Sequence, residues 1–246
     1  MGQIPPLGER RRHQQKTEKN NRSFVKQPIW KRFLSYFFEI AIEASSTDLN
    51  PDLQLGLKKG RYCLSTPNAI YSYGDLYDNF TSSFHKIKIG ESPIKDVLIL
   101  GFGLGSIPFM LEKKFHKKCR YVGVEADEVI AYWAAKYLTN EMASPVQIVV
   151  ADALLFVKTC QQKFDLIAMD IFLDSHIPEQ FETPVFLKKL KSLLNNNGLL
   201  MFNRLSLLKE DREQSTAFFE NTFLKIFPEG YCLDVGGNWM LIGENR

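Results

Sequence analysis

The chain has 246 residues, of which 45% are hydrophobic and 13% aromatic, and its formal net charge is +3. A chain of this length can bury the core of one large domain, or of a core domain with a small appendage. No segment reaches the roughly 20 apolar residues that a membrane span requires, and no apolar run of the kind found in secretory signals follows the first basic residues. The four scattered cysteines form no C-x-x-C pair, which favours reduced thiols over a zinc site. We therefore expect a cytoplasmic protein that holds no metal and inserts into no membrane.

Positive charge is concentrated at the start of the chain. Residues 1–32 carry nine Lys or Arg and two Glu, and residues 1–30 contain few apolar side chains. Such a segment cannot bury a core, so we predict a disordered basic tail over residues 1–30. A basic tail can contact nucleic acid, but a solvated extension is the simpler interpretation, and nucleic acid is kept only as an alternative partner.

Residues 31–90 predict a small N-terminal appendage. The pattern is strand-like from Trp30 onward, and residues 53–66 indicate a hairpin that turns at residues 58–60. From Ser72 or Gly74, apolar side chains recur at helical spacing. They are Leu76, Tyr77, Phe80 and Phe84. We expect a β-hairpin followed by one helix.

From residue 91 to residue 246, apolar strands and amphipathic helices alternate. The expected strands are residues 96–100, 120–126, 146–151, 164–170 and 199–203. The expected helices are residues 105–116, 128–138 (with Asp127 as its cap), 153–160, 184–194 and 212–227. Two further strands, residues 231–235 and 239–244, flank a Gly-Gly-Asn turn that is typical of a hairpin. This order predicts an α/β fold: a doubly wound, mostly parallel seven-stranded sheet with an antiparallel C-terminal hairpin.

Three alternating glycines, Gly101, Gly103 and Gly105, follow the first parallel strand. Ligands of open α/β sheets bind at the carboxyl ends of the strands, and a glycine there lets the backbone lie against a ligand where a Cβ would clash. The loop predicts a nucleotide-type site. It fits a dinucleotide or the adenosyl sulfonium of S-adenosylmethionine, and a tight turn with close helix packing is the structural alternative.

Three acidic residues stand at or just beyond the ends of the next three strands. Glu125 is placed to accept the hydroxyls of a ribose, and Asp152 is placed to accept a hydrogen of an adenine amino group. Asp170 follows the fourth strand. All three face the same edge of the sheet as the glycine loop. An acidic site suits a cationic ligand better than a pyrophosphate, so it favours a sulfonium donor and an amine acceptor.

The strand and loop segments resemble the spermidine synthase-like (polyamine aminopropyltransferase) family of the class I S-adenosylmethionine-dependent methyltransferase fold. The segments that carry this resemblance are DVLILGFGLGS, YVGVEAD, VVADALLFV, FDLIAMDIF and AIYSYGDLYDNF. It implies that Glu125 binds the donor ribose and Asp152 the adenine. It also implies that Asp170 takes a proton from the amine, that Tyr73 lines the acceptor pocket, and that the chain can form a homodimer.

This sequence departs from the family pattern at three positions. Leu104 stands where the family has an acid that binds the amine of the donor. Leu173 stands where a second acid of the catalytic loop is expected, with Asp174 one residue later. Gly74 replaces the glutamine that follows the pocket tyrosine. The identity of both donor and acceptor therefore stays open.

We expect a transferase that moves an alkyl group, with aminopropyl favoured, from S-adenosylmethionine or its decarboxylated form to an amine such as a polyamine. Asp170 would act as the base. Asp174 or Glu179 would hold a distal ammonium, and Tyr71 would line the acceptor pocket together with Tyr73. The alternatives are a methyltransferase of unknown acceptor, for which Leu104 leaves room for a carboxylate, and a non-catalytic nucleoside-binding relative.

Overall fold

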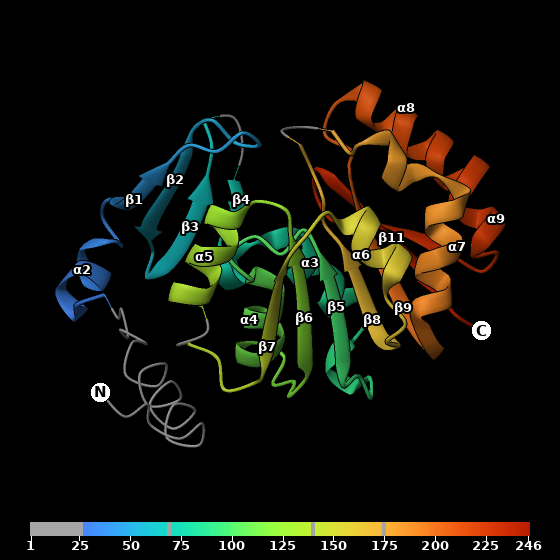
Figure 1. The fold of residues 1–246 in the computed structure, drawn as a ribbon, viewed down its shortest axis with the longest axis horizontal. Coiled ribbons are helices and arrows are strands. Elements are labelled where there is room, and N and C mark those ends of the chain that lie inside the picture. The colour runs from blue at the N-terminus through green and yellow to red at the C-terminus, as the bar shows by residue number, and fades with distance from the viewer. Residues whose placement is uncertain (1–26, 68–69, 139–140, 174–175) are drawn as a thin grey trace, which may run out of the picture.

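The computed structural model describes residues 27–67, 70–138, 141–173 and 176–246, and it contains two β-sheets (Figure 1). A small antiparallel sheet lies near the N-terminus and a larger, mostly parallel sheet forms the body. Nearly all of the predicted tail lies outside the described residues. No helix in the described part of the chain is long and apolar enough to cross a membrane.

The small sheet has four antiparallel strands in the order β1-β2-β3-β4. Their bounds are β1 Ile40–Ser45, β2 Leu53–Lys58, β3 Arg61–Ser65 and β4 Ile70–Ser72. The predicted hairpin is confirmed, with Lys59 and Gly60 at positive φ in its turn. The strand-like assignment from Trp30 is wrong at its start, because a helix, α2 (Ile29–Leu34), occupies that place. None of the α2 residues is buried, so no buried stripe marked the helix in the sequence.

The helix expected from Ser72 or Gly74 begins later. A short 3₁₀ helix, η1 (Gly74–Leu76), comes first, and α3 (Asp78–Lys86) follows after Tyr77, which has an extended backbone. Phe80 and Phe84 of α3 are fully buried, as their helical spacing predicts. A second 3₁₀ helix, η2 (Ile89–Glu91), leads into the large sheet.

The large sheet confirms the predicted fold class, with strand order β10-β11-β9-β8-β5-β6-β7. Its strands are β5 Asp96–Leu100, β6 Arg120–Glu125, β7 Val146–Val150, β8 Phe164–Met169, β9 Leu194–Leu205, β10 Tyr231–Asp234 and β11 Asn238–Glu244. Strand β11 runs antiparallel to both β9 and β10. The chain moves outward from β5 to β7 and then returns to place β8 on the other side of β5. This reversal marks the point where ligands bind in such sheets.

Helices cover both faces of the large sheet (Figure 1). One face packs against α6 (Ala153–Thr159), α7 (Pro184–Leu193) and α8 (Lys209–Phe218), and the other against α3, α4 (Ser106–Lys113) and α5 (Glu128–Tyr137). Along β5, Leu98 and Leu100 belong to the first core and Val97 and Ile99 to the second. All four are fully buried, which explains the continuous apolar run of this strand.

Several predicted boundaries differ from the structure, among them the end of α4, at Lys113 rather than residue 116, and the starts of β9 and α8. Strand β9 begins at Leu194, immediately after α7, and runs through the asparagines that were expected only to end the helix. Helix α8 begins at Lys209 rather than residue 212, where the Asp211 carboxylate accepts the Leu208 N–H at 2.9 Å. It continues as a π-helical turn (Phe219–Phe223) and then as α9 (Leu224–Ile226).

Polar side chains fix the small sheet to α5. The Glu43 carboxylate of β1 accepts hydrogen bonds from Trp133 Nε1 at 3.0 Å, from Lys136 Nζ at 2.6 Å and from the Tyr137 hydroxyl. The Asp127 carboxylate caps the N-terminus of α5 and also accepts a hydrogen bond from Asn50 Nδ2 at 2.8 Å. These bonds hold the small sheet beside the carboxyl end of β6.

Close packing explains why position 105 carries a glycine. Gly105 has φ +77°, and a Cβ there would lie 2.1 Å from Leu138 Cδ2. Gly236, in the C-terminal hairpin, has φ +81° but no atom within 4 Å of its Cβ position.

We therefore expect Gly105→Ala to destabilise the protein more than Gly236→Ala. Both variants incur the strain of a left-handed backbone, about 1–2 kcal/mol, but only Gly105→Ala adds overpacking, roughly 1–3 kcal/mol. Urea unfolding of the two variants and the parent measures the difference. Equal losses would mean that Leu138 moves aside at no cost.

Candidate active site

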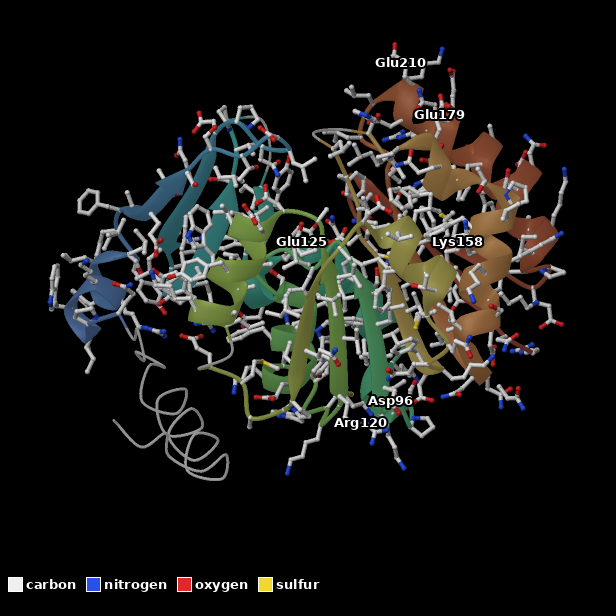
Figure 2. The ribbon with its side chains drawn as sticks, in the orientation of Figure 1. Asp96, Arg120, Glu125, Lys158, Glu179 and Glu210 are labelled. Atoms are coloured by element: carbon white, nitrogen blue, oxygen red, sulfur yellow. The ribbon has the colours of Figure 1, made fainter. Side chains whose placement is uncertain are left out.

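A cavity of about 430 Å³ opens at the carboxyl ends of β5, β6, β7 and β8. Gly101, Gly103, Glu125, Asp152 and Asp170 all line it, so the strand-end features singled out in the sequence meet in one place. Leu49, Asn50, Leu64 and Tyr71 contribute a second wall from the small sheet and its connecting loops. Figure 2 shows Glu125 near the middle of the molecule, whereas Asp96 and Arg120 lie at the opposite edge of the sheet.

The three glycines do different things. A Cβ at Gly101 would lie 2.3 Å from the backbone carbonyl oxygen of Asp170, so this glycine lets β5 and the end of β8 approach each other. The N–H of Gly103 donates to Glu125 Oε2 at 2.9 Å. Gly105 is not among the residues that line the cavity, and its packing matches the structural alternative. The role of Gly105 in donor binding remains a prediction, because this residue does not line the cavity.

The Glu125 carboxylate is held by backbone N–H groups at both oxygens. Oε1 accepts from the N–H of Asp127 at 3.1 Å and Oε2 from that of Gly103. Burial raises the pKa of Glu125, and these hydrogen bonds oppose the rise. Each carboxylate oxygen can accept a second hydrogen bond, which suits the paired hydroxyls of a ribose.

Asp152 caps a helix and lines the cavity at the same time. Its Oδ1 accepts the N–H of Leu155 at 2.8 Å, at the start of α6. Within the described residues, no hydrogen bond to its Oδ2 is present. The ordinary capping role therefore leaves one oxygen for a ligand.

Asp170 lies at the centre of a chain of neutral hydrogen-bond donors. Its Oδ1 accepts from Asn203 Nδ2 at 2.8 Å and from the Tyr77 hydroxyl at 3.4 Å. Asn203 Oδ1 in turn accepts from Asn238 Nδ2 at 3.0 Å. Burial raises the pKa of Asp170 to about 6, while the bonds from Asn203 and Tyr77 act to lower it. A carboxylate with this pKa is ionised at neutral pH yet basic enough to accept a proton.

Sequence reasoning missed three residues of this chain. Asn203 lies near the end of β9, and the search for polar residues at strand ends that found Asp170 could have found it. Tyr77 was counted as one member of an apolar helix face, and Asn238 as a turn residue. Burial raises the pKa of Tyr77 well above its usual value, and the neighbouring Asp170 carboxylate adds to this, so the phenol stays a proton donor.

The other predicted substrate residues separate into three groups. Tyr71 lines the cavity. Tyr73 does not, because its side chain turns toward the small sheet, where burial and the Cys63 thiol raise its pKa. Glu179 begins the 3₁₀ helix η3 (Glu179–Glu182), is exposed, and does not line the cavity, although its neighbours Pro178 and Gln180 do. Asp174 lies outside the described residues. The substrate roles of Tyr73, Glu179 and Asp174 remain predictions.

The two leucines that replace family acids occupy different surroundings. Leu104 is buried in a cluster with Leu53 and Trp133 and does not line the cavity. Leu173 lines the cavity, and its backbone exchanges two hydrogen bonds with that of His176. Neither position supplies a carboxylate.

The charged side chains in the described wall of the cavity are all acidic. Glu125, Asp127, Asp152 and Asp170 line it, and the described residues of its wall include no Lys, Arg or His. Such a surface attracts cations and repels phosphates. The charge of this wall therefore suits a positively charged ligand better than a pyrophosphate.

Comparison with known proteins finds similar chains that are transferases. Residues 81–229 match the family model for the spermine/spermidine synthase domain. A polyamine aminopropyltransferase of Vibrio vulnificus is 30% identical over 138 residues, which cover 55% of this chain and 44% of that relative. The eEF1A lysine and N-terminal methyltransferase of Bos taurus is 27% identical over 126 residues, 46% of this chain and 18% of the relative.

The fold is also that of a solved spermidine synthase. Its complex with the transition-state analogue AdoDATO superposes with a TM-score of 0.64 at 16% identity, over 84% of this chain and 74% of that one. The sequence match to the Vibrio enzyme spans less than half of that enzyme's length, whereas the family model covers more than half of this chain. The chain belongs to the spermine/spermidine synthase domain family.

Proposed function

We propose that the protein transfers an alkyl group, with aminopropyl favoured, from a sulfonium donor of the S-adenosylmethionine type to an amine. The observation that carries this proposal is the cavity itself, where a glycine loop and four carboxylates meet without a cationic side chain among the described wall residues. A sulfonium and an ammonium are both cations, and both suit this surface. The activity named for the Vibrio relative supports the same class of reaction.

In this proposal the donor and the amine bind at different ends of the cavity. Glu125 would accept the ribose hydroxyls and Asp152 the adenine amino hydrogen, on the side of β6 and β7. Asp170 would face the amine on the side of β8 and β9. Because the carbon beside a sulfonium sulfur is already activated, the protein needs chiefly to align the reactants and exclude water.

The chemical step needs one base. An alkyl ammonium has a pKa near the lysine value of about 10.4 and is unreactive while protonated. The amine N–H bond breaks as its proton passes to Asp170, and the nitrogen lone pair forms the new C–N bond. The C–S bond breaks at the same time, and its electron pair stays on sulfur, which leaves a neutral thioether.

Methyl transfer from intact S-adenosylmethionine is the second candidate. One observation favours it: Leu104 lies in an apolar cluster away from the cavity, so the carboxylate that the family uses for the donor amine is missing from this position. The similarity to a lysine and N-terminal methyltransferase is consistent with an amine acceptor in this case too.

Calorimetric titration with five ligands distinguishes the candidates. We expect decarboxylated S-adenosylmethionine and methylthioadenosine to bind more tightly than S-adenosylmethionine, S-adenosylhomocysteine and NAD. Glu125→Gln should weaken every adenosyl ligand by about 10–100-fold, because a hydrogen bond to a charged group contributes roughly 1.5–3 kcal/mol. A preference for the intact donor would establish the methyltransferase alternative. Failure of all five to bind would rule out both.

Replacing the proposed base gives a test of turnover. We expect Asp170→Asn to bind methylthioadenosine as the parent does and to lose about 10²–10⁴-fold in turnover, the usual contribution of a general base. Initial rates with saturating donor and amine measure the loss. Unchanged rates would remove Asp170 from the chemistry.

The same variant should be more stable than the parent at neutral pH. The pKa of Asp170 is raised from 3.8 to about 6 on folding, so ionisation disfavours the folded state, and stability falls as pH rises between these values. Asp170→Asn should therefore gain up to about 3 kcal/mol at pH 7.5 and nothing at pH 3.5. Asp165→Asn is the control with opposite sign, because backbone N–H groups and Asn195 lower the pKa of Asp165. Thermal unfolding at the two pH values measures both, and a loss for Asp170→Asn at pH 7.5 would contradict the argument.

A further inference from the structure

Asn238 is the first residue of β11 and lines the cavity, although neither the fold nor the donor site requires an amide there. It is partly exposed, whereas its partner Asn203 is 1% exposed. The two side chains and Asp170 form a chain of two hydrogen bonds, 3.0 and 2.8 Å long. This chain connects the C-terminal hairpin to the proposed base.

The direction of both hydrogen bonds is fixed by Asp170. An ionised carboxylate can only accept hydrogen bonds, so Asn203 must direct its Nδ2 toward Asp170. Asn203 Oδ1 then faces Asn238 and needs a donor, which only the Nδ2 of Asn238 can supply. The carboxamide oxygen of Asn238 is thereby turned away from Asn203. Within the described residues, it accepts no hydrogen bond.

The same bonds determine which oxygen of Asp170 is available. Oδ1 accepts from both Asn203 and Tyr77, so its two lone pairs are occupied. No hydrogen bond to Oδ2 is present among the described residues. The titratable group beside this carboxylate, the Tyr77 hydroxyl, bonds Oδ1 instead. A proton from a ligand would therefore reach Oδ2.

We propose that Asn238 is an acceptor-binding residue, whose carboxamide oxygen accepts an N–H from the amine that donates its proton to Asp170 Oδ2. This inference rests on the proposed function and specifies its acceptor site. The amine must keep one N–H after it loses a proton to Asp170. The site then takes a primary or secondary amine and rejects a tertiary amine or a hydroxyl compound. Asn203 is a positioning residue that orients Asn238 and Asp170 together.

The test uses decarboxylated S-adenosylmethionine as donor and putrescine as the acceptor probe. Asn238→Ala should raise the KM for putrescine by about 10–100-fold, with kcat within a few-fold of the parent and an unchanged Kd for methylthioadenosine. Asn195→Ala is the matched control. Asn195 Nδ2 donates to Asp165 Oδ1 at 2.7 Å, the same kind of bond at the opposite edge of the sheet, and its loss should leave the KM unchanged.

A second variant preserves the size of the side chain in case Asn238→Ala folds poorly. Asn238→Asp retains an oxygen but loses the donor to Asn203 and places a second carboxylate near Asp170. The acid limb of kcat/KM should then move to higher pH, because a neighbouring negative charge raises the pKa of a carboxyl group. A residue that only packs the hairpin against β9 would leave the KM for putrescine unchanged, even though the new charge moves the pH limb.

The experiment distinguishes failure of the Asn238 assignment from failure of the proposed function. If the parent transfers the aminopropyl group and both Asn238 variants match it in the KM for putrescine, the assignment of Asn238 is overturned and the proposed function stands. If the parent transfers nothing to putrescine or to N-methylputrescine from either sulfonium donor, the proposed function and the role of Asn238 are both overturned.

Discussion

The site depends on one carboxylate, Asp170, which has no cationic partner among the described residues. Asp170 is partly buried in the wall of the cavity, and the groups that bond it, Asn203 and Tyr77, are neutral. A lysine or arginine in their place would stabilise the carboxylate further and lower its pKa. It would also make Asp170 a poor base and repel a cationic ligand. The neutral donors hold the carboxylate in one orientation and still leave its pKa near 6.

The strand order of the large sheet determines the position of the Asp170 carboxylate. Strands β5 and β8 are neighbours because the chain reverses its direction of travel across the sheet between β7 and β8. The N–H of Asp170 donates to the carbonyl of Leu100 at 2.8 Å, and Gly101 leaves room for the Asp170 carbonyl. The glycine loop that faces the proposed donor site therefore also fixes the backbone position of the proposed base, Asp170. Replacing Gly101 would disturb both at once.

The fold could be predicted from the sequence because its strands are buried on both faces and its helices follow at regular intervals. Glu125, Asp152 and Asp170 could be predicted for a related reason, since carboxyl ends of parallel strands meet at one edge. Tyr73 was expected in the acceptor wall, but it follows β4 of the antiparallel small sheet, where that rule does not apply, and the hydroxyl that reaches Asp170 belongs to Tyr77. Helix α2 could not be seen because it buries none of its residues.

Asn203, Tyr77 and Asn238, which sequence reasoning missed, lie on the proposed acceptor side, and the physics of the two sides explains why. The proposed donor side is built from backbone N–H groups and strand-end acids, which are set by the regular βα units. The acceptor side joins β8, β9, β11 and the segment before α3, which are distant in sequence and meet only through tertiary packing. A single substitution at Asn238 or Tyr77 can change that side without disturbing a βα unit. Under the proposed function, such a substitution would change the choice of acceptor and leave the proposed nucleoside site unaltered.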